Sequence, residues 1–86
     1  MHDKVIKSVT GTSHYYRNAL PHRVDGPAVE WANGDKEWWL NGKRHREDGP
    51  AYEGADGHKT WHYHGKRIEC KDNQEFLRIV KLMAFL

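Results

Sequence analysis

The sequence has 86 residues, a formal net charge of +2 and one cysteine, Cys70. This length provides for one small hydrophobic core in a single domain, 1–86, and a lone cysteine excludes an intramolecular disulfide. The mild charge excludes an electrostatic field strong enough to indicate nucleic-acid binding by itself.

Three features of the composition favour a folded chain in the cytoplasm. Aromatic residues make up 12% of a chain that is 30% charged, so large rings are expected to supply much of the burial. The N-terminus lacks the apolar stretch of a signal peptide, and a thiol without a partner is unusual in secreted proteins. The apolar tail at 76–86 is too short to span a bilayer and carries Arg78 and Lys81, so no membrane association is expected.

The first segment, 1–21, is predicted to be a degenerate β-hairpin. Strands at 5–10 and 12–17 would flank Gly11, because the same order of glycine followed by aromatics returns in better-preserved form further along the chain.

Two tandem repeats follow, at 22–44 and 45–67. Shifting the chain by 23 residues aligns these segments with 14 identities in 23 positions, where average residue usage gives roughly one or two. Such self-similarity is typical of repeat architectures.

Each repeat has the pattern of a hairpin. In the first, strands at 27–32 and 35–40 flank Asn33-Gly34, the preferred pair where both turn residues need a positive φ. A second turn at Asn41-Gly42 ends the hairpin, and Asp25-Gly26-Pro27 breaks the chain before the strand that follows. The prediction is an antiparallel meander of up to six strands.

The periodicity changes at 72–86, which is predicted to be a helix. Asp72 followed three residues later by Glu75 resembles a capping box. Phe76, Ile79 and Val80 share a face at helical spacing, so this face is expected to cover one side of the sheet. The fold class is therefore mainly β (β+α), an antiparallel meander of repeated β-hairpins with a C-terminal α-helix packed on one face.

The phrase Trp-x-x-Asn-Gly-Lys-Arg-His-Arg-x-Asp-Gly-Pro-Ala at 38–51 resembles the variant MORN-type repeats of short bacteriophage and giant-virus proteins. The resemblance covers about three quarters of the chain and implies a twisted sheet of consecutive hairpins that serves as an interaction surface. The ordinary MORN repeat ends in His-Gly-x-Gly, which is replaced here, so its membrane association is not carried over.

Residues copied from one repeat to the next are interpreted as structural. Asp would close an Asx turn, Arg would bridge neighbouring hairpins, His would bond a backbone carbonyl and Trp would lie in the core. The structural set comprises His22, Arg23, Asp25, Trp38, His45, Asp48 and Trp61. A catalytic constellation is disfavoured, because catalysis needs one arrangement and not an element repeated intact.

Binding is assigned to basic and aromatic residues outside that core set. Adjacent loops would line cations along one sheet edge near stacking rings, and Trp31 has Gly54 at its position in the next repeat, which favours a contact role. The predicted binding residues are Trp31, Trp39, Arg44, Arg46, Tyr63 and Arg67. A metal site at His58, His62 and His64, which would share a strand face, is considered and disfavoured, so no metal and no cofactor is expected.

The favoured function is a non-enzymatic viral interaction module that binds and modulates a host protein in the host cytoplasm, as an anti-defence or host-takeover factor would. The alternative is a sponge for a nucleotide or short nucleic acid, held by the basic loops and exposed aromatics. A His-dependent phosphodiesterase ranks third. A homodimer is also expected, because a short meander ends in unpaired edge strands.

Overall fold

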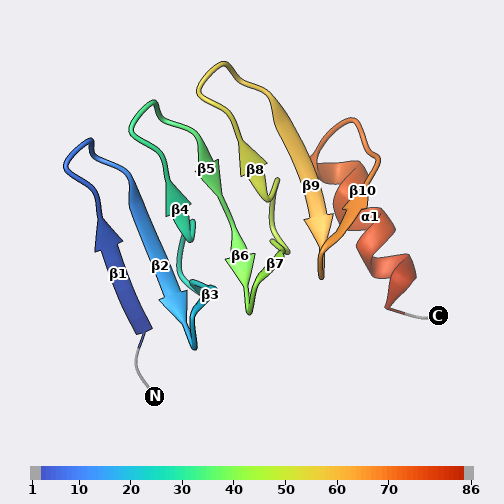
Figure 1. Cartoon of the computed structure of the whole chain (residues 1–86). Coiled ribbons are helices and arrows are strands. Elements are labelled where there is room, and N and C mark those ends of the chain that lie inside the picture. The colour runs from blue at the N-terminus through green and yellow to red at the C-terminus, as the bar shows by residue number, and fades with distance from the viewer. Residues whose placement is uncertain (1–2, 85–86) are drawn as a thin grey trace.

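The computed structural model describes residues 3–84, which form a meander of short strands followed by one helix (Figure 1). The elements in chain order are β1 (Asp3–Lys7), β2 (Ser13–Arg17), β3 (Leu20–Pro21), β4 (Val29–Glu30), β5 (Lys36–Glu37), β6 (Trp39–Leu40), β7 (Lys43–Arg44), β8 (Tyr52–Glu53), β9 (Lys59–Tyr63), β10 (Lys66–Ile68) and α1 (Asn73–Met83).

The main sheet has the strand order β1-β2-β4-β5-β8-β9-β10, with β3 paired to β2 and a separate ladder between β6 and β7. Every pairing is antiparallel. Opposite charges alternate across the centre of the sheet, where Glu30 faces Lys36, Lys36 faces Glu53 and Glu53 faces Lys59. Such cross-strand pairs favour this register. The prediction of an antiparallel meander with a C-terminal helix on one face is confirmed.

The structure has more and mostly shorter strands than predicted. Turns of two kinds, one of two residues and one of three, follow each other along the chain and interrupt the extended segments. Both residues of Asn41-Gly42 have a positive φ, 49° and 80°, as the type I′ hairpin turn requires. The predicted two-residue turn at Asn33-Gly34 is wrong, since Gly34 has a positive φ and Asn33 does not. There the Trp31 N–H donates to the Asp35 carbonyl, 2.9 Å, and the Gly34 N–H to the Trp31 carbonyl, 3.0 Å, which makes a three-residue loop.

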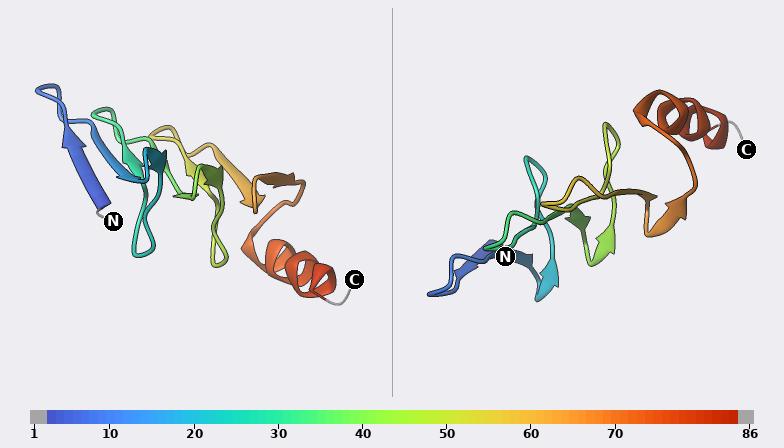
Figure 2. Two further views of the ribbon diagram at one scale, coloured as in Figure 1. Left: turned by 60° about the horizontal axis from the view of Figure 1, so that its bottom comes forward. Right: turned by 90° about the horizontal axis from the view of Figure 1, so that it is seen from above.

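The loops at 22–27 and 45–50 leave the sheet on the same side as α1 (Figure 2). We call this side the loop face and the opposite side of the sheet the open face. Trp38 and Trp61 point to the loop face, since Arg46 stacks on Trp38 and Asn73 at the start of α1 accepts a hydrogen bond from Trp61. Because strand residues alternate, Glu37, Trp39 and their equivalents point to the open face.

Helix α1 begins where the sequence predicts. The Asp72 side chain accepts from the Glu75 N–H, 2.9 Å, which is the N-cap bond of a capping box. The Glu75 side chain accepts from the N–H of Lys71, the residue before the cap, 3.0 Å, so the returning bond is displaced by one residue. The helix ends at Met83, and the last two residues of the predicted range, 85 and 86, lie outside the described residues. No helix within residues 3–84 has the length and apolar character to cross a membrane.

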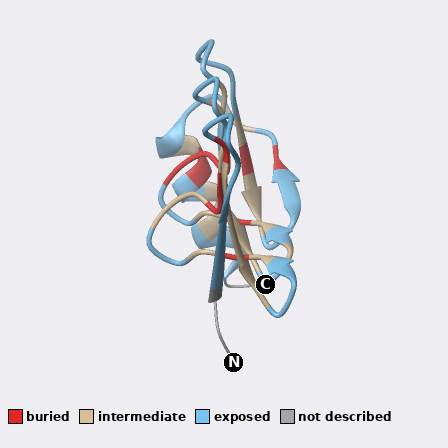
Figure 3. Cartoon of the chain, turned by 60° about the vertical axis from the view of Figure 1, so that its left-hand side comes forward, coloured by how far each residue is buried: buried red, intermediate tan, exposed pale blue. Residues whose placement is uncertain are grey.

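The core lies at the C-terminal end of the sheet, where α1 packs over the last hairpin. Trp61, Ile68 and Phe76 form its buried centre, and Phe76 is fully enclosed. Buried residues also mark the roots of the two loops, as in Figure 3. The helix lies on one side of the sheet as expected, where it covers the last hairpin, and the two loops occupy the rest of that face.

Candidate functional site

The repeated histidines join each loop to the turn of the next hairpin. His22 Nδ1 accepts from the Asn41 N–H, 2.9 Å, and His45 Nδ1 accepts from the His64 N–H, 2.7 Å. The histidines were expected to donate to a backbone carbonyl, but instead they accept from a backbone N–H. The turn amide needs an acceptor, and the lone pair of a neutral imidazole supplies one. Both histidines are buried, at 5% and 4% exposure.

We expect the stability of the chain to fall as the solution becomes mildly acidic. Burial lowers the pKa of His45, the nearby His64 lowers it further, and Glu47 opposes both only in part. The pKa in the folded chain thus lies below the ordinary value of 6.5, so the unfolded chain binds a proton more readily. This contribution to stability is complete above about pH 6.5 and is lost as the pH falls toward the folded pKa.

The measurement is the urea midpoint of unfolding between about pH 7.5 and 5. The midpoint should decrease with falling pH, and the decrease should be smaller in His45→Gln. Burial also lowers the pKa of His62, which leaves a residual slope in that variant. A midpoint that is constant or rises over this interval would contradict the role of neutral His45.

The repeated arginines lie flat on aromatic rings of the preceding hairpin. The guanidinium carbon of Arg23 is 4.0 Å from the ring centre of Tyr15, and that of Arg46 is 3.9 Å from Trp38. Arg46 also donates to Asp48 at 2.9 Å and to Glu53 at 2.9 Å. Each arginine thereby contacts both an aspartate of its own loop and a ring of the preceding hairpin.

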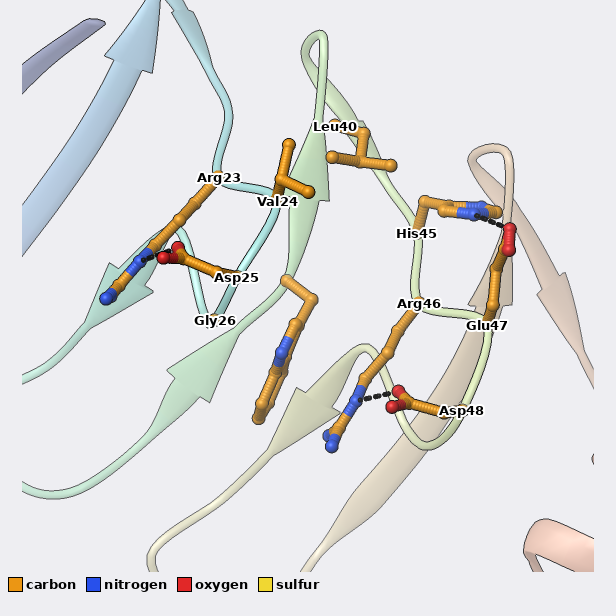
Figure 4. Close-up of a pocket in the computed structure, with 10 residues that line it drawn as sticks. Arg23, Val24, Asp25, Gly26, Leu40, His45, Arg46, Glu47 and Asp48 are labelled. Atoms are coloured by element: carbon orange, nitrogen blue, oxygen red, sulfur yellow. Dashed lines mark hydrogen bonds and ion pairs between the residues drawn. The ribbon is translucent and has the colours of Figure 1, made fainter.

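A groove of about 580 Å³ lies between the two loops (Figure 4), and Trp38 is among the residues that line it. Arg23 and Arg46 line it, yet each is paired with the aspartate two residues on, at 3.0 Å and 2.9 Å. Cations already neutralised in this way offer little attraction to a phosphate. The predicted anion-binding role of Arg46 therefore has no support in the geometry.

Glu37 is the centre of the open face. The residue is 9% exposed, and its carboxylate accepts from Trp31 Nε1, from Trp39 Nε1 at 3.0 Å and from Arg44 Nη2 at 3.1 Å. Burial alone would raise the pKa of Glu37, but these hydrogen bonds and the Arg44 charge outweigh it and lower the pKa. The ionised carboxylate therefore holds two indoles and one guanidinium in place on the open face.

Aromatic rings extend outward from this anchor. Trp31 is 42% exposed and meets the edge of His14 at a centroid distance of 5.5 Å, and His14 stacks on Tyr16 at 6.0 Å. On the other side, the Arg44 guanidinium lies 5.3 Å from the Trp39 ring centre and 5.7 Å from that of Tyr52. We call His14, Tyr16, Trp31, Trp39, Arg44 and Tyr52 the aromatic patch.

The structure divides the predicted binding residues between the two faces. Trp31, Trp39 and Arg44 come together on the open face, and Arg67 shares that face because it pairs with His62. Arg46 lies on the loop face, and Tyr63 packs beside His45 at 4.9 Å. The predicted row of cations along one edge is wrong, because Arg44 in β7 points to the open face and Arg46 in the loop after it points to the loop face.

Sequence reasoning missed Glu37, because the signal for it was weak. Thr60 occupies its position in the next repeat, so the repeat pattern does not single it out. The three histidines that were considered as a metal site and disfavoured do not share one strand face. His64 lies in a turn against His45, whereas His62 lies on the open face beside Thr60. Within residues 3–84 no three metal-ligating side chains are grouped to hold an ion.

Comparison with known proteins returned no match to any family model, curated protein or solved structure.

Proposed function

We propose that this chain is a non-enzymatic interaction module that binds another protein through the aromatic patch. The observation that carries the proposal is the Trp31 ring, exposed yet held in place by Glu37 on one side and His14 on the other. An indole held in advance loses little entropy on binding and buries a large area, which is why Trp, Tyr and Arg dominate interface energetics.

The charge distribution supports a protein partner over a phosphate-bearing ligand. Arg44 is paired with Glu37 at 3.1 Å, Arg46 with Asp48 at 2.9 Å and Arg67 with Glu69 at 3.1 Å. A nucleotide would have to compete with each carboxylate. The resemblance to viral repeat proteins adds the further proposal that the partner is a host protein whose activity changes on binding.

The test is affinity capture from a bacterial lysate with the wild type, Trp31→Ala and Val24→Ala. Val24 is 79% exposed but lies on the loop side, so its variant is the matched control. We expect Trp31→Ala to weaken capture of a specific protein by roughly 30-fold or more, equivalent to about 2 kcal/mol. The control should bind like the wild type, with little dependence on salt. Circular dichroism establishes that both variants fold.

A different result would support the nucleotide-binding alternative. Nucleotides extracted from the captured material, with binding that falls steeply as salt increases and is lost in Arg44→Ala, would favour the phosphate-binding alternative. Equal capture by all three proteins would place the binding surface elsewhere.

A further inference from the structure

The two ends of the sheet are finished differently. At the C-terminal end, β10 also has a single neighbour, β9, but it is only three residues long, and α1 packs on the loop face of their hairpin. At the other end, β1 pairs with β2 alone, and no strand within residues 3–84 lies along its outer edge. An uncovered edge strand of this length is a template for another strand, unless it is blunted.

The hydrogen-bond pattern shows which backbone groups are free on that edge. The Ser8 N–H donates to the Thr12 carbonyl at 2.8 Å, so residues 8 and 12 form a hydrogen-bonded pair. The preceding pair of the same ladder is Lys7 opposite Ser13. Because bonded pairs alternate along an antiparallel ladder, residues 4 and 6 direct their amides toward β2 and residues 3, 5 and 7 direct theirs outward. Tyr15, the partner of Val5, agrees with this alternation, since its N–H points away from β1 and donates to the Ala28 carbonyl, 2.8 Å.

The side chains of β1 combine an apolar centre with two lysines, a residue type that hinders edge pairing. Val5 is 48% exposed and Ile6 is 54% exposed, and they lie on opposite faces. Lys4 and Lys7 flank them, which leaves an apolar centre with a charge on either side. Such a strand buries apolar area on both faces when a second strand is added.

We propose that β1 pairs with β1 of a second copy of this chain, antiparallel and centred on Val5. This inference goes beyond the proposed function and does not depend on it. Pairing must join outward residues to outward residues, which excludes every register shifted by one position. The register centred on Val5 uses residues 3, 5 and 7 of both copies, whereas a centre at Ile6 uses only 5 and 7 within the strand.

The pairing would join the open faces of two copies. Lys4 and Ile6 lie on the open face, because their partners in β2 are Tyr16 and His14 of the aromatic patch. A hollow of about 470 Å³ lined by Lys4, Ile6 and Tyr16 borders this edge. In the dimer the two aromatic patches would belong to one continuous twisted sheet.

The first test is disulfide trapping in a Cys70→Ser background. Hydrogen-bonded antiparallel pairs have Cα atoms about 5.5 Å apart, which a disulfide can bridge. Val5→Cys should therefore give a covalent dimer on mild oxidation. Ile6→Cys, on the same exposed strand, is the control, because its two copies would sit diagonally, beyond the roughly 7 Å limit for a bridge.

The second test is a charge substitution followed by sedimentation velocity. Val5→Lys places two like charges opposite each other and should weaken the dimer by roughly tenfold, whereas Val9→Lys, at a fully exposed residue outside β1, should leave it unchanged. Three results would overturn the proposal: a strict monomer at every concentration, faster trapping at Ile6→Cys than at Val5→Cys, or equal dissociation constants for Val5→Lys and Val9→Lys. None of them bears on the aromatic patch, so the proposed function is tested separately.

Discussion

Replacing Trp61 by alanine should unfold most of the chain at room temperature. The Trp61 ring is 9% exposed, packs with Ile68 and the fully buried Phe76, and donates to Asn73 at 2.7 Å. Truncating a buried tryptophan costs about 3–5 kcal/mol. Few hydrophobic side chains within residues 3–84 are buried, so the total stability is expected at the low end of the usual range. At roughly 0.05 kcal/mol per residue it is about 4 kcal/mol, which the loss of the Trp61 ring matches.

Trp38→Ala is the matched control, because Trp38 occupies the same position in the preceding repeat. It is half-buried, and one side of its ring is covered by the Arg46 guanidinium instead of a helix. We expect a smaller loss of about 1–2 kcal/mol, from partial burial and the cation–π contact. Thermal and urea denaturation, monitored by circular dichroism, measure the loss of stability in both variants. Equal losses in the two variants would show that α1 adds nothing to the stability of the last hairpin.

Arg46→Ala should produce the largest loss of stability among the arginine variants. Its guanidinium joins Asp48, the Pro50 carbonyl at 3.1 Å and Glu53, while stacking on Trp38. Hydrogen bonds to charged groups contribute more than neutral ones, so we expect a loss of about 2–3 kcal/mol. Arg46→Lys should recover only part of it, since an ammonium lacks the planar fork that makes these contacts together.

Arg67→Ala is the control for this prediction. Arg67 is 58% exposed and pairs with Glu69, itself 82% exposed, and exposed ion pairs contribute about 0–1 kcal/mol. The unfolding midpoint should therefore change little. If Arg46→Ala were as mild as Arg67→Ala, Arg46 would be a surface cation after all, and the phosphate-binding alternative would regain its strongest residue.

The local features were predictable from the sequence because they depend on neighbours along the chain. Asp72 caps the helix by accepting from the Glu75 N–H, since an N-cap bond needs only residues three apart. The 23-residue shift predicts that His22 and His45 have equivalent surroundings, and both accept a turn amide. The alternation of strand residues likewise places Trp38 and Trp39 on opposite faces of the sheet.

The tertiary structure decided which of the two faces is covered and which charges meet. Alternation defines two faces but does not say that the loops and α1 take the one with Trp38 and Trp61, which leaves Trp31 and Trp39 on the other. Glu37 joins Arg44 from a neighbouring strand, and Arg46 reaches Glu53 across its loop. These partners are set by how the loops leave the sheet and how the strands lie side by side. For that reason the sequence predicts a row of free cations, whereas the fold pairs those arginines with carboxylates and leaves an aromatic patch exposed.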